Sequence, residues 1–232
     1  VNIGNGDSVN LIGITLADWH NPPSPEPEVD TRTQIDGSGQ ADDIRAGYVH
    51  ANGTFLDASL SEEVVVNAGA GDDVIYAKRT SNSQFNGEEG NDTIMAAFSE
   101  EAILDGGSGN DVLNLGFRAS TGLGGTGDDI LIGSLLKGDG KVMTGGAGSD
   151  TFEFTDPGTK DTASIVTDFD GAEDTLIIDG VTLSGLASSA DLSSDFTVSE
   201  ASGDLTLSFA GSNGTAVHTV TLENTTAEDF FL

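Results

Sequence analysis

The eight residues Gly106-Gly107-Ser108-Gly109-Asn110-Asp111-Val112-Leu113 decide the fold of this chain. Glycine occupies the first, second and fourth positions, aspartate the sixth, and a large apolar residue the eighth. Variants of the pattern begin at residues 37, 68, 87, 124 and 145, and three of the six copies match it in full. Intervals of 31, 19, 19, 18 and 21 residues separate the sixth-position aspartates, which are Asp42, Asp73, Asp92, Asp111, Asp129 and Asp150. Such a repeat predicts a stack of similar turns.

The pattern is similar to the hemolysin-type calcium-binding repeat of RTX proteins, the nonapeptide G-G-x-G-x-D-x-U-x. The resemblance covers residues 33–232. It implies an all-β fold, a right-handed parallel β-roll (solenoid) capped by an antiparallel β C-terminal region. Two nonapeptides, about 18 residues, make one turn in this family. The six loops are therefore expected to stack along one edge of the roll.

The loop residues suit calcium, because glycine exposes its carbonyl oxygen and aspartate adds a hard carboxylate oxygen. If each ion bridges two neighbouring loops, six loops hold at most five ions, and we expect four or five Ca²⁺ in the roll. The predicted ligands are Gly37, Gly39, Asp42, Gly69, Gly71, Asp73, Gly87, Glu89, Asp92, Gly106, Ser108, Asp111, Gly124, Thr126, Asp129, Gly145, Ala147 and Asp150.

The first loop is the least regular of the six. The gap between Asp42 and Asp73 exceeds one turn, and residues 48–63 are predicted to form an inserted loop. Gln40 also replaces the glycine expected at the fourth position, which places the Asp42 loop in doubt as a calcium ligand.

Eighth-position residues begin short strands and are predicted to point inward as one apolar column: Ile44, Ile75, Ile94, Leu113, Leu131 and Phe152. On the return strands we expect Phe85, Ile103, Leu123 and Met143 to point inward as well. The loops at the opposite edge lack the glycine-aspartate pattern, so calcium is predicted on one edge only. That opposite edge is predicted to carry five of the eight basic residues, Lys78, Arg79, Arg118, Lys137 and Lys141. They either offset acidic repulsion on a solvated face or form a contact edge for an acidic polysaccharide or a partner domain.

Composition supports a cation as the partner. The 232 residues include 39 Asp and Glu against 8 Lys and Arg, a formal net charge of −31, which disfavours nucleic acid and anionic membrane surfaces. Such a charge is also typical of a disordered acidic tail, but the regular apolar column argues against that alternative. Cysteine is absent, which excludes disulfides and thiolate sites. No apolar run approaches the roughly 20 residues of a membrane span.

We predict four regions: a remnant of an upstream segment (1–20), a Pro-rich linker (21–32), the calcium β-roll (33–156) and a C-terminal β cap (157–232). Residues 161–232 contain no Lys or Arg and end in Ala227-Glu228-Asp229-Phe230-Phe231-Leu232. This ending resembles the C-terminal signal of type I secretion substrates; the alternative is a last strand that packs its phenylalanines.

The segment from Asp161 to Asp174 is similar to the one that closes the roll in secreted RTX proteins. Asp161, Asp168, Asp170 and Asp174 are candidate ligands of another ion; the alternative is a solvated acidic turn.

The resemblance implies a calcium-dependent folding module of a secreted, extracellular bacterial protein that is exported by a type I system and carries its active domain upstream. One alternative is a carbohydrate-binding module similar to the R-modules of alginate epimerases. Another is an adhesive surface module, although the third loop positions form no threonine ladder. We expect no enzyme activity, because the three histidines form no cluster and metal coordination already accounts for the loop carboxylates. An enzyme hidden in the acidic loops remains the competing hypothesis.

Overall fold

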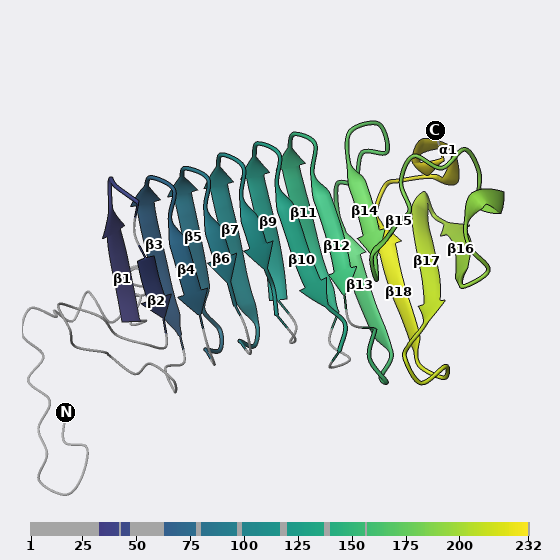
Figure 1. Ribbon diagram of the computed structural model, residues 1–232, viewed down its shortest axis with the longest axis horizontal. Coiled ribbons are helices and arrows are strands. Elements are labelled where there is room, and N and C mark those ends of the chain that lie inside the picture. The colour runs from purple at the N-terminus through teal and green to yellow at the C-terminus, as the bar shows by residue number, and fades with distance from the viewer. Residues whose placement is uncertain are drawn as a thin grey trace, which may run out of the picture. The chain divides into compact units, whose positions relative to one another are not determined.

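A computed structural model describes residues 33–41, 43–46, 63–77, 80–96, 99–116, 120–136, 140–155 and 157–231. Two sheets face each other along the roll (Figure 1). In the first, β1(Thr33–Ser38), β3(Val64–Ala70), β5(Gln84–Glu89), β7(Ala102–Ser108), β9(Ser120–Thr126), β11(Lys141–Ala147) and β13(Thr162–Val166) stack in parallel. In the second, the parallel strands are β2(Asp43–Ala46), β4(Val74–Ala77), β6(Thr93–Met95), β8(Val112–Asn114), β10(Ile130–Ser134), β12(Thr151–Thr155) and β14(Thr175–Ile178). The predicted parallel β-roll is confirmed.

Antiparallel strands close the C-terminal end, as predicted. β18(Val217–Leu222) lies parallel to β13 and pairs with β17(Asp204–Ala210), which pairs with β16(Phe196–Ala201) at the end of the first sheet. β15(Val181–Thr182) pairs antiparallel with β14 at the end of the second sheet. The short helices η1(Ser189–Asp191) and α1(Ala227–Phe230) complete the cap. Parallel stacking thus continues through β13 and β14, beyond residue 156.

The eighth-position column forms the core of the second sheet, as predicted. Its members Ile75, Ile94, Leu113, Leu131 and Phe152 are fully buried, and Ile44 packs partly buried against them. In-register pairing of the parallel strands places these side chains directly above one another.

The inward column of the first sheet differs from the prediction at two strands. Phe85 and Met143 are buried as expected, but Ile103 is 41% exposed and Leu123 is only half-buried. The register places the inward position two residues before the first loop position: Val66, Phe85, Leu104, Gly122 and Met143. Side chains alternate between the faces of a strand, so residues one or three positions before the loop must point outward.

Lys141 also departs from the prediction. Its side chain is fully buried inside the roll, and its backbone N–H donates to Ser164 Oγ at 3.1 Å. It therefore does not contribute to a solvated basic edge. Lys78, Arg79, Arg118 and Lys137, which were expected there too, lie outside the described residues, as does Asp42. Across the part of the chain that the structure describes, no helix has the length and apolarity of a membrane span.

Candidate metal centre

Six buried aspartates line the edge where the first sheet passes into the second. Asp92 Oδ1 accepts the N–H of Asp73 and Asp111 Oδ1 that of Asp92, both at 2.7 Å. The series continues with Asp129 accepting from Asp111, Asp150 from Asp129 and Asp174 from Asp150, at 2.8 to 2.9 Å. We call this series, Asp73, Asp92, Asp111, Asp129, Asp150 and Asp174, the aspartate ladder. From Asp92 onward, each carboxylate thus ties its own turn to the preceding one.

The second carboxylate oxygen has a different role. Oδ2 of Asp92, Asp111 and Asp129 is buried and has no hydrogen-bond partner. Asp111 Oδ2 lies over the Cα of Gly106, where the carbonyl oxygen of Gly124 from the next turn also points. Asp92 and Asp129 repeat this arrangement with the carbonyls of Gly106 and Gly145. Because an unpaired buried charge is costly, these converging oxygens require a cation or a proton.

Glycine is required where successive turns come closest. Gly109 has a φ of 121°, and a Cβ there would overlap the carbonyl of Gly90 in the preceding turn. The second-position Gly107, with a φ of 101°, would collide with the carbonyl of Glu88 in the same way. The glycine pattern therefore reflects both backbone conformation and the spacing of the stack.

Burial sets the electrostatics of the aspartate ladder. It raises the pKa of Asp129 to about 7, and repulsion from Asp111 and Asp150 adds to the rise while the N–H of Asp111 opposes it. Burial likewise raises the pKa of Asp92 to about 6 and of Asp174 to about 6, and it raises the pKa of Asp111 and Asp150. Burial and mutual repulsion thus destabilise the ionised form of these neighbouring carboxyls, and a bound proton or a bound cation would offset both effects.

A second ladder, on the exposed side of the loops, was not predicted. Fifth-position side chains accept backbone N–H groups in the opposite direction: Asp72 from Asn91, Asn91 from Asn110, Asn110 from Asp128 and Asp128 from Ser149. We call Asp72, Asn91, Asn110 and Asp128 the outer ladder. The sequence signal was the run of Asp and Asn at the fifth position of four consecutive loops.

The other predicted ligands occupy the same edge. The carbonyls of the third-position residues each accept the N–H of the fourth-position glycine in the preceding loop, at 2.8 Å, and keep one lone pair: Glu89, Ser108, Thr126 and Ala147. Gly69 and Gly71 have positive φ and lie against the first loop, where a Cβ on either would overlap Ser38 or Gln40 and Ala41. In that loop Gly37 lies against the carbonyl of Ala68, and Gly39 has open space around its Cα.

The closing segment divides the four aspartates that the sequence grouped together. Asp161 precedes β13, at the opposite edge of the roll, and accepts the N–H of Val217 at 2.9 Å. Asp168 follows β13 and accepts the N–H groups of Gly145 and Gly146. Asp174 belongs to the aspartate ladder, and its Oδ2 accepts the N–H of Asp170 at 2.8 Å. The structure therefore separates Asp161 from the other three.

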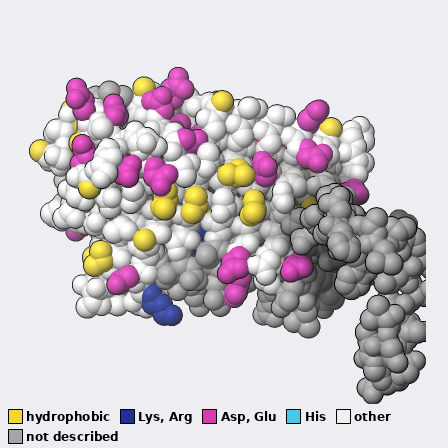
Figure 2. All heavy atoms as spheres, turned by 180° about the vertical axis from the view of Figure 1, so that it is seen from behind, with side chains coloured by type: hydrophobic (Ala, Val, Ile, Leu, Met, Phe, Trp, Pro, Cys, Tyr) yellow, Lys and Arg dark blue, Asp and Glu magenta, His cyan; other side chains and the backbone are white. Residues whose placement is uncertain are grey.

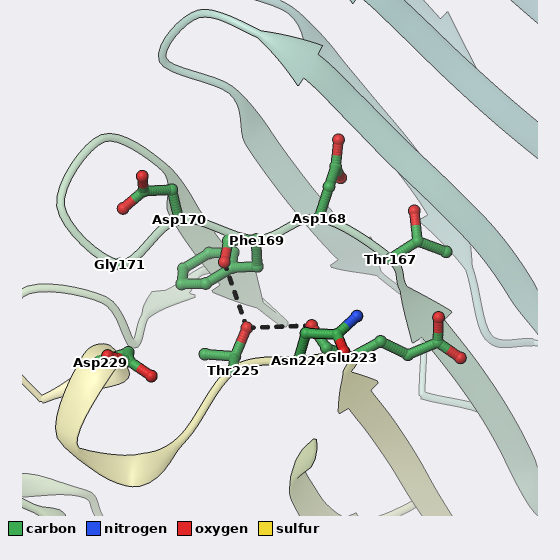
Figure 3. A pocket seen from close by; sticks show the side chains of 9 residues that line it. All are labelled: Thr167, Asp168, Phe169, Asp170, Gly171, Glu223, Asn224, Thr225 and Asp229. Carbon is green, nitrogen blue, oxygen red and sulfur yellow. Dashed lines mark hydrogen bonds between the residues drawn. The ribbon is translucent and has the colours of Figure 1, made fainter. Parts of the chain in front are cut away.

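An acidic hollow of about 530 Å³ lies between the closing segment and the C-terminal segment (Figure 3). Asp168 and Asp170 line one side, and Glu223 and Asp229 the other. The Thr225 hydroxyl joins the two sides, since it donates to the carbonyls of Phe169 and Glu223. Among the described residues no three Asp, Glu or His side chains form a metal cluster, so the additional ion at this segment stays a prediction.

The aspartate ladder fits calcium without such a cluster. The loops of Asp92, Asp111 and Asp129 each supply one buried carboxylate oxygen, and the carbonyl oxygen of the first-position glycine in the next loop lies beside it. Ca²⁺ accepts six to eight oxygen ligands in a flexible geometry, so a shell built mainly from carbonyls suits it. Smaller Mg²⁺ demands near-ideal octahedral geometry and fits such a loop poorly.

A protein-family model recognises part of this repeat. The model of the RTX calcium-binding nonapeptide repeat (4 copies) matches residues 64–83, 79–98 and 103–117. None of the curated proteins matches the chain. Among solved structures, the chain is similar to the extracellular lipase LipA from Serratia marcescens, with 15% identity and a TM-score of 0.28. That match covers 84% of this chain and 38% of the lipase, so the chain spans well under half the length of that protein.

Proposed function

We propose that this chain, a β-roll module with RTX calcium-binding repeats, folds when calcium binds and thereby stabilises a secreted protein. The observation that carries the proposal is the row of buried, unpartnered Oδ2 atoms on Asp92, Asp111 and Asp129, each beside a carbonyl of the next turn. When bound there, calcium would supply positive charge between successive loops. In Asp92, Asp111 and Asp129, Oδ1 would hold the register of the turns, while Oδ2 and the neighbouring glycine carbonyl would bind the ion.

Folding and metal binding are coupled in this proposal because the site exists only when the turns are stacked. Each member of the aspartate ladder comes from a separate turn, so an unfolded chain does not bring the oxygens together. Without a cation the buried carboxylates repel, and the net charge of −31 opposes compaction. Binding free energy therefore becomes folding free energy.

We further propose an extracellular role with export by a type I system. Extracellular calcium modules bind at about 10⁻⁴–10⁻³ M, so such a module would remain unfolded in the cytosol and fold outside. The lack of Lys and Arg from residue 161 onward supports the proposed export signal. The last residues, however, also pack in the cap: α1 begins with a capping box between Thr226 and Asp229, and Phe230 is buried against Phe169. A last strand that packs its phenylalanines was the predicted alternative to an export signal. Residues 227–230 instead form the helix α1.

We propose no catalytic role for the module; an active domain would be its partner upstream. The carbohydrate-binding alternative depends on a basic groove at the calcium-free edge. Five basic residues were predicted at that edge. Lys141 lies inside the roll, and the other four lie outside the described residues, so no observation favours the carbohydrate-binding function.

Far-ultraviolet circular dichroism during a calcium titration from a chelated start tests the folding proposal, with Mg²⁺ in a parallel titration. We expect a cooperative gain of β signal at millimolar calcium and no comparable gain with magnesium. Isothermal titration calorimetry on the same protein counts the ions, for which we expect four or five. A protein that is fully folded in chelator, or one that stays unfolded in calcium, would overturn the proposal.

A further inference from the structure

The C-terminal cap contains two hollows that meet at Phe196. The larger, about 500 Å³, lies along β16 and is mainly apolar, with a lining that includes Leu192, Phe196, Val198, Leu205, Ala227 and Phe231. The smaller, about 280 Å³, has Phe196 and Phe209 in its wall, with ring centroids 5.6 Å apart. Neither hollow contains a residue of the aspartate ladder, so both are separate from the calcium edge.

The larger hollow follows the free edge of a sheet. β16 is the last strand of its sheet and, among the residues that the structure describes, pairs only with β17 (Figure 1). Five consecutive residues of this strand, 196–200, line the hollow, so it is open along the backbone and not only on one face. An edge strand beside an apolar hollow suits an extended peptide, whose backbone can pair with the edge while alternate side chains enter the hollow.

Charge indicates which peptide fits. Residues 161–232 contain 13 Asp and Glu and no Lys or Arg, so no basic side chain within this region offsets its negative charge. Acidic side chains are spread over the face of the molecule that Figure 2 shows. Glu200 lines the larger hollow, and Asp179 and Asp195 line the smaller one. A second copy of this acidic cap would be repelled, whereas a basic segment would be attracted.

We propose that β16 and its two hollows bind an extended segment of a partner protein in which basic residues alternate with large apolar ones. The apolar side chains enter the larger hollow beside Val198, and the basic side chains that alternate with them point away from it, where the net negative charge of the cap attracts them. The surface needs the folded cap but not the ion sites of the roll, so this proposal is independent of the function proposed above.

Titration of the full chain, held in saturating calcium, with three synthetic peptides tests the proposal. The first is a ten-residue peptide that alternates Lys or Arg with Val or Leu. The second carries Glu in place of every basic residue, and the third keeps the composition of the first but groups all basic residues in one half. We expect saturable binding of the first, at least about tenfold tighter than that of the other two. Backbone amides of residues 196–201 should exchange more slowly in its presence.

Two matched variants separate the hollow from general charge attraction. Val198→Lys places a positive charge in the larger hollow, whereas Val142→Lys makes the same change on the outward face of β11, where Val142 is 37% exposed. Val198→Lys should weaken binding at least about tenfold and Val142→Lys less than about twofold. Circular dichroism confirms that each variant folds. The proposal is wrong if no peptide saturates, if the third binds as tightly as the first, or if both variants weaken binding equally.

Discussion

At the scale of single residues, the two oxygens of each aspartate in the ladder have separate tasks. Asp111 Oδ1 accepts the N–H of Asp92 at 2.7 Å, an interaction that an amide oxygen can replace. Asp111 Oδ2 is buried and unpartnered, and in asparagine its place is taken by an NH2 group, which donates hydrogen bonds and cannot bind a cation. Asparagine at residue 111 should therefore keep the hydrogen bond that sets the register of the turns but lose the oxygen that binds the metal.

Asp111→Asn is expected to raise the calcium concentration for half-saturation about tenfold, or about 1.4 kcal/mol, and to reduce the number of bound ions. Asp128→Asn is the matched control, because Asp128 belongs to the exposed outer ladder and an amide oxygen can still accept the N–H of Ser149. Calorimetric calcium titration of both variants measures the difference. Equal affinities would contradict the assignment of Oδ2 as a calcium ligand.

A second residue-scale prediction concerns strain. Glu88 has a φ of 77° at the second loop position, where Gly69, Gly107, Gly125 and Gly146 also have positive φ. A side chain in this conformation costs about 1–2 kcal/mol. Glu88→Gly should stabilise the calcium-loaded protein by about 1 kcal/mol and raise its midpoint temperature by about 2–4 °C.

Thermal unfolding followed by circular dichroism tests this, with Glu88→Gln as the comparison. That variant removes the same charge but keeps the side chain and its strain. If both substitutions raise the midpoint equally, charge rather than backbone conformation limits stability at this position.

At the scale of elements, the repeat predicted the loops and the strands that leave them, because glycine and aspartate must recur wherever turns stack. It did not predict the inward faces of β7 and β9. Ile103 and Leu123 look like core residues by hydrophobicity alone, yet the inward positions are Leu104 and Gly122. The space at Gly122 is taken by Leu115, which follows β8, and by Leu131 of β10 in the facing sheet. The sequence of β9 alone does not reveal these contacts.

Asp174 is a residue of the candidate site whose place in the aspartate ladder could not be predicted from the sequence. It ends the aspartate ladder, but it comes 24 residues after Asp150 and follows an irregular loop without the glycine pattern. The sequence grouped it with Asp161, Asp168 and Asp170 as one candidate site, but β13 lies between Asp161 and the other three and places Asp161 at the opposite edge of the roll. The regular loops were predictable from their period, and the closing loop required the structure.

The spacing of turns gives an element-scale prediction. Gly109→Ala places a Cβ against the carbonyl of Gly90 at a φ of 121°, which should cost at least about 2 kcal/mol of unfolding free energy. Gly39→Ala is the control, since nothing lies within 4 Å of its Cβ position and its φ is not positive. Urea unfolding in saturating calcium compares the two. A tolerated alanine at residue 109 would mean that the turns are not stacked as closely as described.

At the scale of the whole molecule, protons and calcium compete for the same buried charge. The folded-state pKa is about 6 for Asp92, about 7 for Asp129 and about 6 for Asp174, all above the ordinary value of 3.8. Between that value and the raised ones, the folded chain binds more protons than the unfolded chain. Without calcium, the folded state should therefore be most stable near pH 3.8, and its free energy of unfolding should fall as the pH rises through 6 and 7.

Acid should consequently replace part of the calcium. We expect the chelated chain to gain β signal when the pH falls from 8 to 5, whereas at pH 5 more calcium should be needed for half-saturation because protons must leave the aspartate ladder. Circular dichroism in chelator at both pH values measures the first effect, and calcium titrations at both measure the second. Asp129→Asn should reduce both effects, since it removes the carboxyl with a pKa near 7. A chelated chain with no more structure at pH 5 than at pH 8 would show that repulsion within the ladder does not control folding.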